Sequence, residues 1–125
     1  MILRPVPKMS EPKNKYRAKK TKIDGIQFDS KAEAYRYGYL KSLEHNGSIS
    51  GLKTQVKYLL VGKNKKDDGK MERECCYLAD FVYQDIFGKT VVEDVKGQLR
   101  PTPLYILKRK LMLSVHGVTV KEIRK

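Results

Sequence analysis

Two apolar stretches near the middle of the chain constrain its fold most. Residues 77–83 (Tyr-Leu-Ala-Asp-Phe-Val-Tyr) and 91–97 (Val-Val-Glu-Asp-Val-Lys-Gly) are rich in β-branched and aromatic residues, and residues 85–89 between them have a turn-like composition. This pattern predicts two strands of a hairpin. Because side chains alternate across a strand, Asp94 and Lys96 leave one face and Glu93 leaves the other. Hairpin pairing can then lay Asp80 alongside Asp94 and Lys96.

These charges on an apolar sheet have two interpretations. Asp94 and Lys96 could lie on the solvated face of an edge strand, with Asp80 as a cross-strand partner of Lys96. Alternatively, the charges converge on a buried patch, where unpaired charges are costly and where a divalent cation and a phosphate would stabilise them. Valines at positions 91, 92 and 95 leave neither face of the second strand uniformly polar, which favours the second interpretation.

Length and charge define the general class of the protein. A chain of 125 residues with 40% hydrophobic residues and no Trp supports one domain with a thin core. Its formal net charge of +13 suits a polyanion, of which DNA and RNA are the commonest. Charge alone does not distinguish a nuclease from a ribosomal protein or a repressor.

The cysteines and the hydropathy indicate the compartment. Cys75 and Cys76 are adjacent, so they form neither a disulfide framework nor a zinc site. No apolar run approaches membrane-spanning length, and the N-terminus lacks a signal-peptide core. We therefore predict a soluble cytoplasmic protein with no membrane partner and no organic cofactor.

The N-terminal region combines prolines with basic residues. Residues 1–14 carry three prolines and no periodicity, which predicts a flexible tail before a single domain at 15–125. Residues 13–22 hold six basic residues and no acid, and Asp24-Gly25 is a turn signal. Residues 16–28 are therefore expected to form a small hairpin or arm, which is either a solvated strand or a contact to the DNA backbone.

The clearest helix is predicted from Ser30 to His45, where Asn46-Gly47 ends it. Glu33 lies three residues after Ser30, the spacing of a capping box. Glu33 can thus bond the backbone at the helix start or reach the acidic patch, and the residues alone favour the cap. The expected apolar stripe of this helix comprises Ala32, Tyr35, Tyr39, Leu40 and Leu43.

The remaining elements complete an αβββαβ order, an α/β fold with a mixed sheet. A strand is expected at 49–61 with a bulge at Gly51, a hairpin loop at 62–70, a connector at 97–103, a helix at 104–115 and a final strand at 118–123. The expected core side of the second helix is Leu104, Leu107, Leu111 and Val115, with Lys108, Arg109 and Lys110 largely around the rest.

This order, with an acid on the second strand and Asp-x-Lys on the third, resembles the restriction-endonuclease-like core of the PD-(D/E)XK nucleases. Within that superfamily, the chain resembles a small phage-associated family to which endonuclease activity is attributed. The resemblance covers about residues 14–125. The matching segments are 15–33, Gln55, 79–81 and 93–97.

The resemblance implies a role for each matching residue. Asp80 matches the acid of the "PD" element, with Ala79 where the superfamily often has proline. Asp94 and Lys96 match the acid and lysine of the third strand. Glu33 matches an acid supplied by the first helix, and the resemblance raises its functional interpretation above the cap. Gln55 would support the site, while Asp80, Asp94 and Glu33 would be the metal ligands.

The implied activity is Mg²⁺-dependent hydrolysis of DNA phosphodiester bonds, with Mn²⁺ able to substitute. Lys96 would orient the attacking water, deprotonate it, or stabilise negative charge. By analogy, the substrate could be branched DNA such as a Holliday junction, cut by a homodimer. The competing class is a non-catalytic nucleic-acid-binding module, against which the intact acids and Lys96 argue. The expected DNA contacts are Arg17, Lys19, Lys20, Lys22, Lys108, Arg109 and Lys110.

Overall fold

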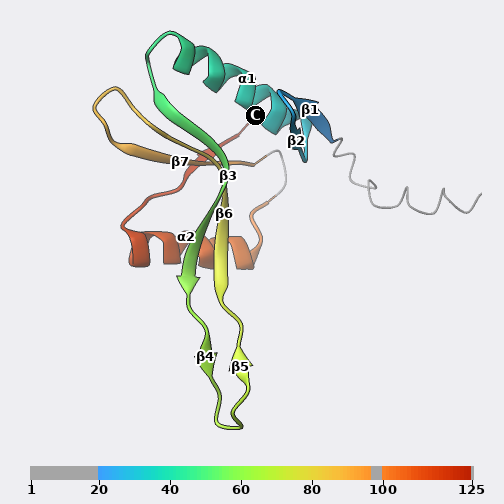
Figure 1. The fold of residues 1–125 in the computed structure, drawn as a ribbon, viewed down its shortest axis with the longest axis vertical. Coiled ribbons are helices and arrows are strands. Elements are labelled where there is room, and N and C mark those ends of the chain that lie inside the picture. The colour runs from blue at the N-terminus through green and yellow to red at the C-terminus, as the bar shows by residue number, and fades with distance from the viewer. Residues whose placement is uncertain (1–19, 97–99, 125) are drawn as a thin grey trace, which may run out of the picture.

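The computed structural model describes residues 20–96 and 100–124. The predicted tail at 1–14, the arm residues Arg17 and Lys19, and the start of the predicted connector lie outside these ranges. Two helices and eight strands are described (Figure 1): β1 (Thr21–Ile23), β2 (Ile26–Phe28), α1 (Lys31–His45), β3 (Ser50–Val61), β4 (Asn64–Lys65), β5 (Met71–Glu72), β6 (Cys75–Gln84), β7 (Thr90–Val95), α2 (Pro103–His116) and β8 (Lys121–Ile123).

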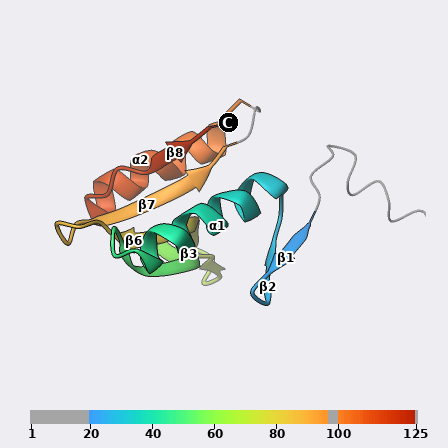
Figure 2. The same cartoon turned by 90° about the horizontal axis from the view of Figure 1, so that it is seen from above.

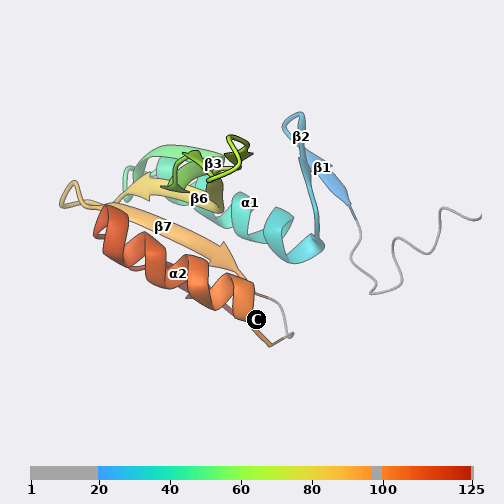
Figure 3. The same cartoon turned by 90° about the horizontal axis from the view of Figure 1, so that it is seen from below.

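The central sheet has four strands in the order β3-β6-β7-β8. The first three strands are antiparallel, and β8 runs parallel to β7, to which α2 provides the crossover. Figures 2 and 3 show β7 lying between α1 and α2. The predicted order and the mixed sheet are confirmed. The β4–β5 hairpin projects from the end of β3 and β6 as an exposed extension (Figure 1).

The β6–β7 hairpin fixes the register of the acidic residues. The backbone N–H of Asp85 donates to the carbonyl of Lys89 over 2.9 Å, which confirms the predicted turn. Phe81 pairs with Glu93 and Val82 pairs with Val92. A slip of one residue would move every side chain to the opposite face, so the turn and the burial of Phe81 and Val92 together specify this register.

The predicted hairpin of the basic arm forms between β1 and β2. Asp24 and Gly25 both have positive φ angles, 54° and 79°, as a tight two-residue hairpin turn requires. The hydroxyl of Tyr37 on α1 donates to Asp24 Oδ2 over 3.0 Å. Phe28 is fully buried beside the rings of Tyr37 and Phe81. The hairpin therefore packs on α1 as part of the core.

The predicted apolar stripe of α1 is wrong in part. Tyr35 and Tyr39 are 82% and 50% exposed, while Ala34, Tyr37 and Leu40 are buried. The buried residues share the face that meets the β1–β2 hairpin and β6. Helical spacing alone allowed either set of tyrosines to face inward, because a tyrosine is tolerated both in a core and at a surface.

The predicted core face of α2 is also wrong in part. Leu104, Leu107 and Val115 are each at least half exposed, and the buried residues are Tyr105 and Met112. The hydroxyl of Tyr105 donates to a carboxylate of β8, so a polar anchor sets the rotation of this helix. Within the described ranges, neither helix has the length and apolar character needed to span a bilayer.

Candidate active site

One part of the β3–β6 strand pair packs against α1, and the other part packs against α2. Leu52 packs in the cluster around α1, whereas Leu60 belongs to the cluster around α2. Regular alternation would keep both side chains on one face of β3. Gln55 lies between them with φ of 54°, a left-handed conformation that is uncommon for residues other than glycine. The predicted bulge at Gly51 is present as a separate register shift between Ser50 and Lys53.

Asp80 lies at the same change of face on β6. Ala79 packs in the α2 cluster and Phe81 in the α1 cluster. The register places Asp80 opposite Gln55, because the flanking residues pair as Thr54 with Phe81 and Val56 with Ala79. Asp80 therefore projects where the two halves of the core meet.

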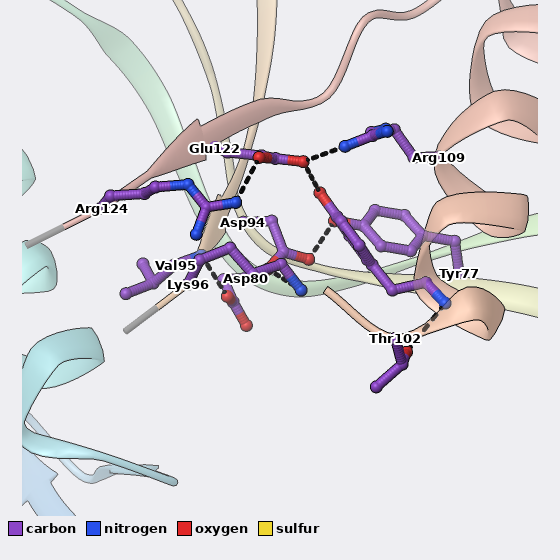
Figure 4. A network of polar contacts seen from close by, with 10 residues as sticks. Tyr77, Asp80, Asp94, Val95, Lys96, Thr102, Arg109, Glu122 and Arg124 are labelled. Atoms are coloured by element: carbon purple, nitrogen blue, oxygen red, sulfur yellow. Dashed lines mark hydrogen bonds and ion pairs between the residues drawn. The ribbon is translucent and has the colours of Figure 1, made fainter. Parts of the chain in front are cut away.

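Asp94 and Lys96 lie together beside Asp80, as the hairpin pattern predicts. Oδ2 of Asp80 accepts the backbone N–H of Val95 over 2.8 Å. Lys96 Nζ lies 3.2 Å from Asp94 Oδ1, and the hydroxyl of Tyr77 donates to Asp94 Oδ2 over 2.5 Å. Figure 4 shows Asp80, Asp94 and Lys96 gathered in this way. Asp80, Asp94 and Lys96 thus form one cluster at the end of β7, which we call the acidic group.

Lys96 is held at three points. Its backbone N–H donates to the carbonyl of Ile123 over 2.8 Å, which extends the β7–β8 pairing by one residue. Its Nζ lies 3.2 Å from the centroid of the Tyr105 ring and is paired with Asp94. Its side chain is only 19% exposed. Both contacts of the ammonium are with groups that stabilise a cation.

Glu33 belongs to the cap and also to the acidic group. Ser30 Oγ accepts the backbone N–H of Glu33 over 3.2 Å, which confirms the predicted cap of α1. Yet Oε1 of Glu33 is buried and has no hydrogen-bond partner, the single buried side-chain atom in this condition in the described part of the chain. Burial, followed by the charges of Asp80, Asp29 and Asp94, raises the pKa of Glu33 to about 7.

Asp80 is perturbed in the same direction. Burial raises the pKa of Asp80 to about 6, the charges of Asp94 and Asp29 add to this effect, and the Val95 N–H and Lys96 oppose it. Strongly raised carboxyl pKa values are a feature of functional sites, because crowding like charges needs a compensating gain. The sequence patterns assigned no role to Asp29, whose one signal is its place just before the helix cap.

The acidic side chains provide the carboxylate oxygens that a divalent cation such as Mg²⁺ prefers as ligands. Among residues 20–96 and 100–124, no group of three or more His, Cys, Asp or Glu side chains is placed to hold a metal ion. Mg²⁺, however, commonly uses one or two carboxylates and keeps several waters. The unpartnered Oε1 of Glu33, beside Asp80 and Asp94, supplies the oxygen donors that such an ion prefers.

Glu93 faces away from this group, as strand alternation predicts. Its carboxylate is fully buried and accepts Nε and Nη2 of Arg36 over 2.9 and 2.7 Å. The hydroxyl of Tyr83 donates to it as well. This bidentate pair joins α1 to β7 and thereby helps to position the helix that carries Glu33.

The basic residues of α2 differ in their surroundings. Arg109 Nη1 lies 2.6 Å from Glu122 Oε2, and together with Tyr105 and Arg124 it lowers the pKa of Glu122 to about 2. Lys108 is half-buried and Lys110 is exposed. The structure therefore does not bring the three predicted DNA contacts into one free patch. Hydrophobic periodicity carried no signal for Glu122.

The fold and the site define a mixed α/β protein with an acid–lysine group at the end of β7. The chain belongs to the family described as "Protein of unknown function (DUF1064)", whose model matches residues 13–123. Comparisons with curated proteins and with solved structures gave no match.

Proposed function

We propose that this protein is a divalent-metal-dependent endodeoxyribonuclease of the PD-(D/E)XK kind. The observation that carries the proposal is the convergence of Asp80, Asp94 and Lys96 with Glu33, whose Oε1 is buried without a hydrogen-bond partner. A fold gains nothing from crowding these acids unless a cation or a proton is bound there. The competing interpretation, a module that only binds nucleic acid, would gain from losing carboxylates near phosphate.

Asp80, Asp94 and Glu33 would hold the cation, and Mn²⁺ would substitute for Mg²⁺. A bound Mg²⁺ would neutralise charge on the scissile phosphate and lower the pKa of a water ligand. The raised pKa values of Glu33 and Asp80, about 7 and about 6, mean that protons compete with the cation at these oxygens. We therefore expect metal binding to strengthen as the pH rises through this range.

Lys96 would stabilise negative charge on the phosphate. Its ammonium is fixed by Asp94 and by the face of Tyr105, both of which favour a cation. This arrangement supports electrostatic stabilisation over proton abstraction from water. A preorganised cation aimed at developing charge is among the larger contributions to catalysis.

DNA is the proposed partner because the chain has a net charge of +13. Lys20 and Lys22, at the start of the β1–β2 hairpin, are both exposed. We further propose that the protein works in the cytoplasm, a reducing compartment that suits the free thiols of Cys75 and Cys76.

A homodimer that cuts branched DNA is the finer form of this proposal. Leu104, Leu107 and Val115 lie on one side of α2 and are 59%, 54% and 50% exposed. A run of exposed apolar side chains along a helix suits a symmetric contact in which both copies use the same patch. Two copies would bring one active site to each of two strands.

The test is cleavage of linear, nicked, single-stranded and four-way-junction DNA with Mg²⁺, with Mn²⁺ and with EDTA. The native chain should cut only when a divalent ion is present, and Asp80→Asn and Asp94→Asn should abolish cutting. Asp67→Asn is the matched control, because Asp67 is exposed near the tip of the β4–β5 hairpin. Equal rates for Asp80→Asn and Asp67→Asn would contradict the proposed site.

A further inference from the structure

A hollow of about 380 Å³ opens beside the acidic group, between α1 and the ends of β7 and β8. Its volume lies within the range of small-molecule sites. The lining of the hollow includes Ala32, Tyr35, Arg36, Tyr39, Val95 and Arg124. None of these residues belongs to the acidic group described above.

Tyr35 is the most exposed part of this lining, with 82% of its surface open to solvent. The same side chain also lines a second hollow of about 420 Å³, together with Thr21, Ile23 and Lys31. Tyr35 therefore stands between two hollows, one next to the β1–β2 hairpin and one next to β7 and β8. A ring placed in this way offers a flat surface to a planar ligand.

Fixed cations flank the hollow beside β7 and β8. Arg36 is locked by the buried carboxylate of Glu93, and its guanidinium lies 5.0 Å from the centroid of the Tyr39 ring. The side chain of Arg124 is 45% exposed and is paired with Glu122 over 2.9 Å. Aromatic faces interleaved with cations are the pattern by which proteins hold single-stranded nucleic acid.

The hollow adjoins the acidic group. Val95 lines it and also donates its backbone N–H to Asp80. Ala32 lines it and immediately precedes Glu33 on α1. A strand with a base in this hollow would have its phosphates next to the acidic group.

We propose that Tyr35 stacks an unpaired base of DNA, so that the substrate class is DNA with a single-stranded segment at the site. The exposed Lys31, which lines the hollow next to the β1–β2 hairpin, is placed to meet the phosphates of the strand that continues toward that hairpin. Duplex DNA keeps its bases stacked on one another and cannot fill the hollow without losing a base pair. This inference rests on the DNA ligand of the proposed function and does not depend on cleavage.

The experiment measures DNA binding by fluorescence anisotropy in EDTA, where no metal-dependent cutting occurs. Tyr35→Ala should weaken binding of a labelled single-stranded oligonucleotide roughly 5- to 100-fold, the usual effect of removing one stacking ring. Its affinity for a matched duplex should change less than about twofold, because phosphate contacts dominate there. Tyr35→Phe keeps the ring and should bind like the native chain.

Phe87→Ala is the matched control, because Phe87 is 91% exposed on the distant β6–β7 turn. It should leave both affinities unchanged. The inference would be overturned if Tyr35→Ala bound single-stranded DNA as tightly as the native chain does, or if it lost equal affinity for single-stranded and duplex DNA. It would also be overturned if the native chain bound single-stranded RNA more tightly than single-stranded DNA. If Tyr35→Ala loses affinity for single-stranded DNA while the native chain cuts no DNA in the cleavage test, the inference about Tyr35 is upheld and only the nuclease proposal is refuted.

Discussion

Replacing Glu33 by Gln separates a structural role from a catalytic one. Ser30 Oγ caps the backbone N–H of Glu33, and this bond does not involve the Glu33 carboxylate. Gln also suits a capping box, so the substitution preserves the start of α1. What it removes is a carboxylate whose pKa is raised from 4.5 to about 7, first by burial and then by Asp80, Asp29 and Asp94.

The raised pKa sets both the sign and the size of the stability effect. The native state binds this proton more tightly than the unfolded state, so native stability falls as the pH rises from about 4.5 through about 7. A tenfold change in proton affinity is worth about 1.4 kcal/mol, so this rise in pKa sets an upper limit of about 3.5 kcal/mol on the effect. Partial exposure to solvent reduces the expected effect to roughly 1–3 kcal/mol. The free energy of unfolding of Glu33→Gln, taken relative to that of the native chain, should therefore increase by this amount between about pH 4 and about pH 8.

Urea denaturation at the two pH values, with and without Mg²⁺, measures this gain. Any pH-independent cost of the new amide cancels in the difference between the two pH values. Saturating Mg²⁺ should stabilise the native chain more than the variant, because the variant lacks one donor. The cleavage rate of Glu33→Gln should fall by at least about a hundredfold if the carboxylate holds the cation. A stability difference that does not vary with pH, together with unchanged cleavage, would remove Glu33 from the site.

Four further substitutions probe the neighbours of this group. Lys96→Ala should slow cleavage at saturating DNA and metal by about a hundredfold or more, while affinity for DNA measured in EDTA changes little. Glu93→Gln should instead lower the free energy of unfolding by about 3–5 kcal/mol in urea titrations, because it leaves Arg36 without its buried carboxylate. Gln55→Gly should preserve or raise the Tm, since φ of 54° suits glycine, and any loss of cleavage would then report on the side chain. Leu107→Asp should reduce the mass measured by light scattering to that of a monomer; a native chain that is already monomeric would refute the dimer.

The position of the acid–lysine group was predictable because it depends on local rules. Strand alternation put Asp94 and Lys96 on one face and Glu93 on the other, and the turn at residues 85–89 fixed the pairing with the strand of Asp80. The cap at Ser30 followed from spacing in the same way. These features require only the periodicity of a strand and the chemistry of a helix start.

The rotation of each helix was not predictable, because it depends on partners that are distant in sequence. Tyr37 faces inward on α1 since Phe28 of the β1–β2 hairpin and Phe81 of β6 pack against it, which leaves Tyr35 at the surface. On α2, Tyr105 and Arg109 turn toward Glu122 of β8. A hydrophobic pattern does not indicate such distant partners, so it placed Leu40 and Leu111 correctly on the core sides of the helices but assigned Tyr35, Tyr39, Leu104, Leu107 and Val115 to the core as well.

Two local costs coincide at one point of the sheet, and this coincidence is the strongest physical support for a functional site there. Gln55 adopts a left-handed backbone conformation in the middle of a strand, and burial, together with the neighbouring acids, raises the pKa values of Asp80 and Glu33 to about 6 and about 7. Each feature destabilises the fold by itself. Asp80 is the residue opposite Gln55, so the change of face in β3 and β6 occurs at the same point as the acid whose charge acts on Glu33. A chain selected only for stability would relieve both costs with glycine and asparagine, whereas a cation-dependent site needs the acids where they are.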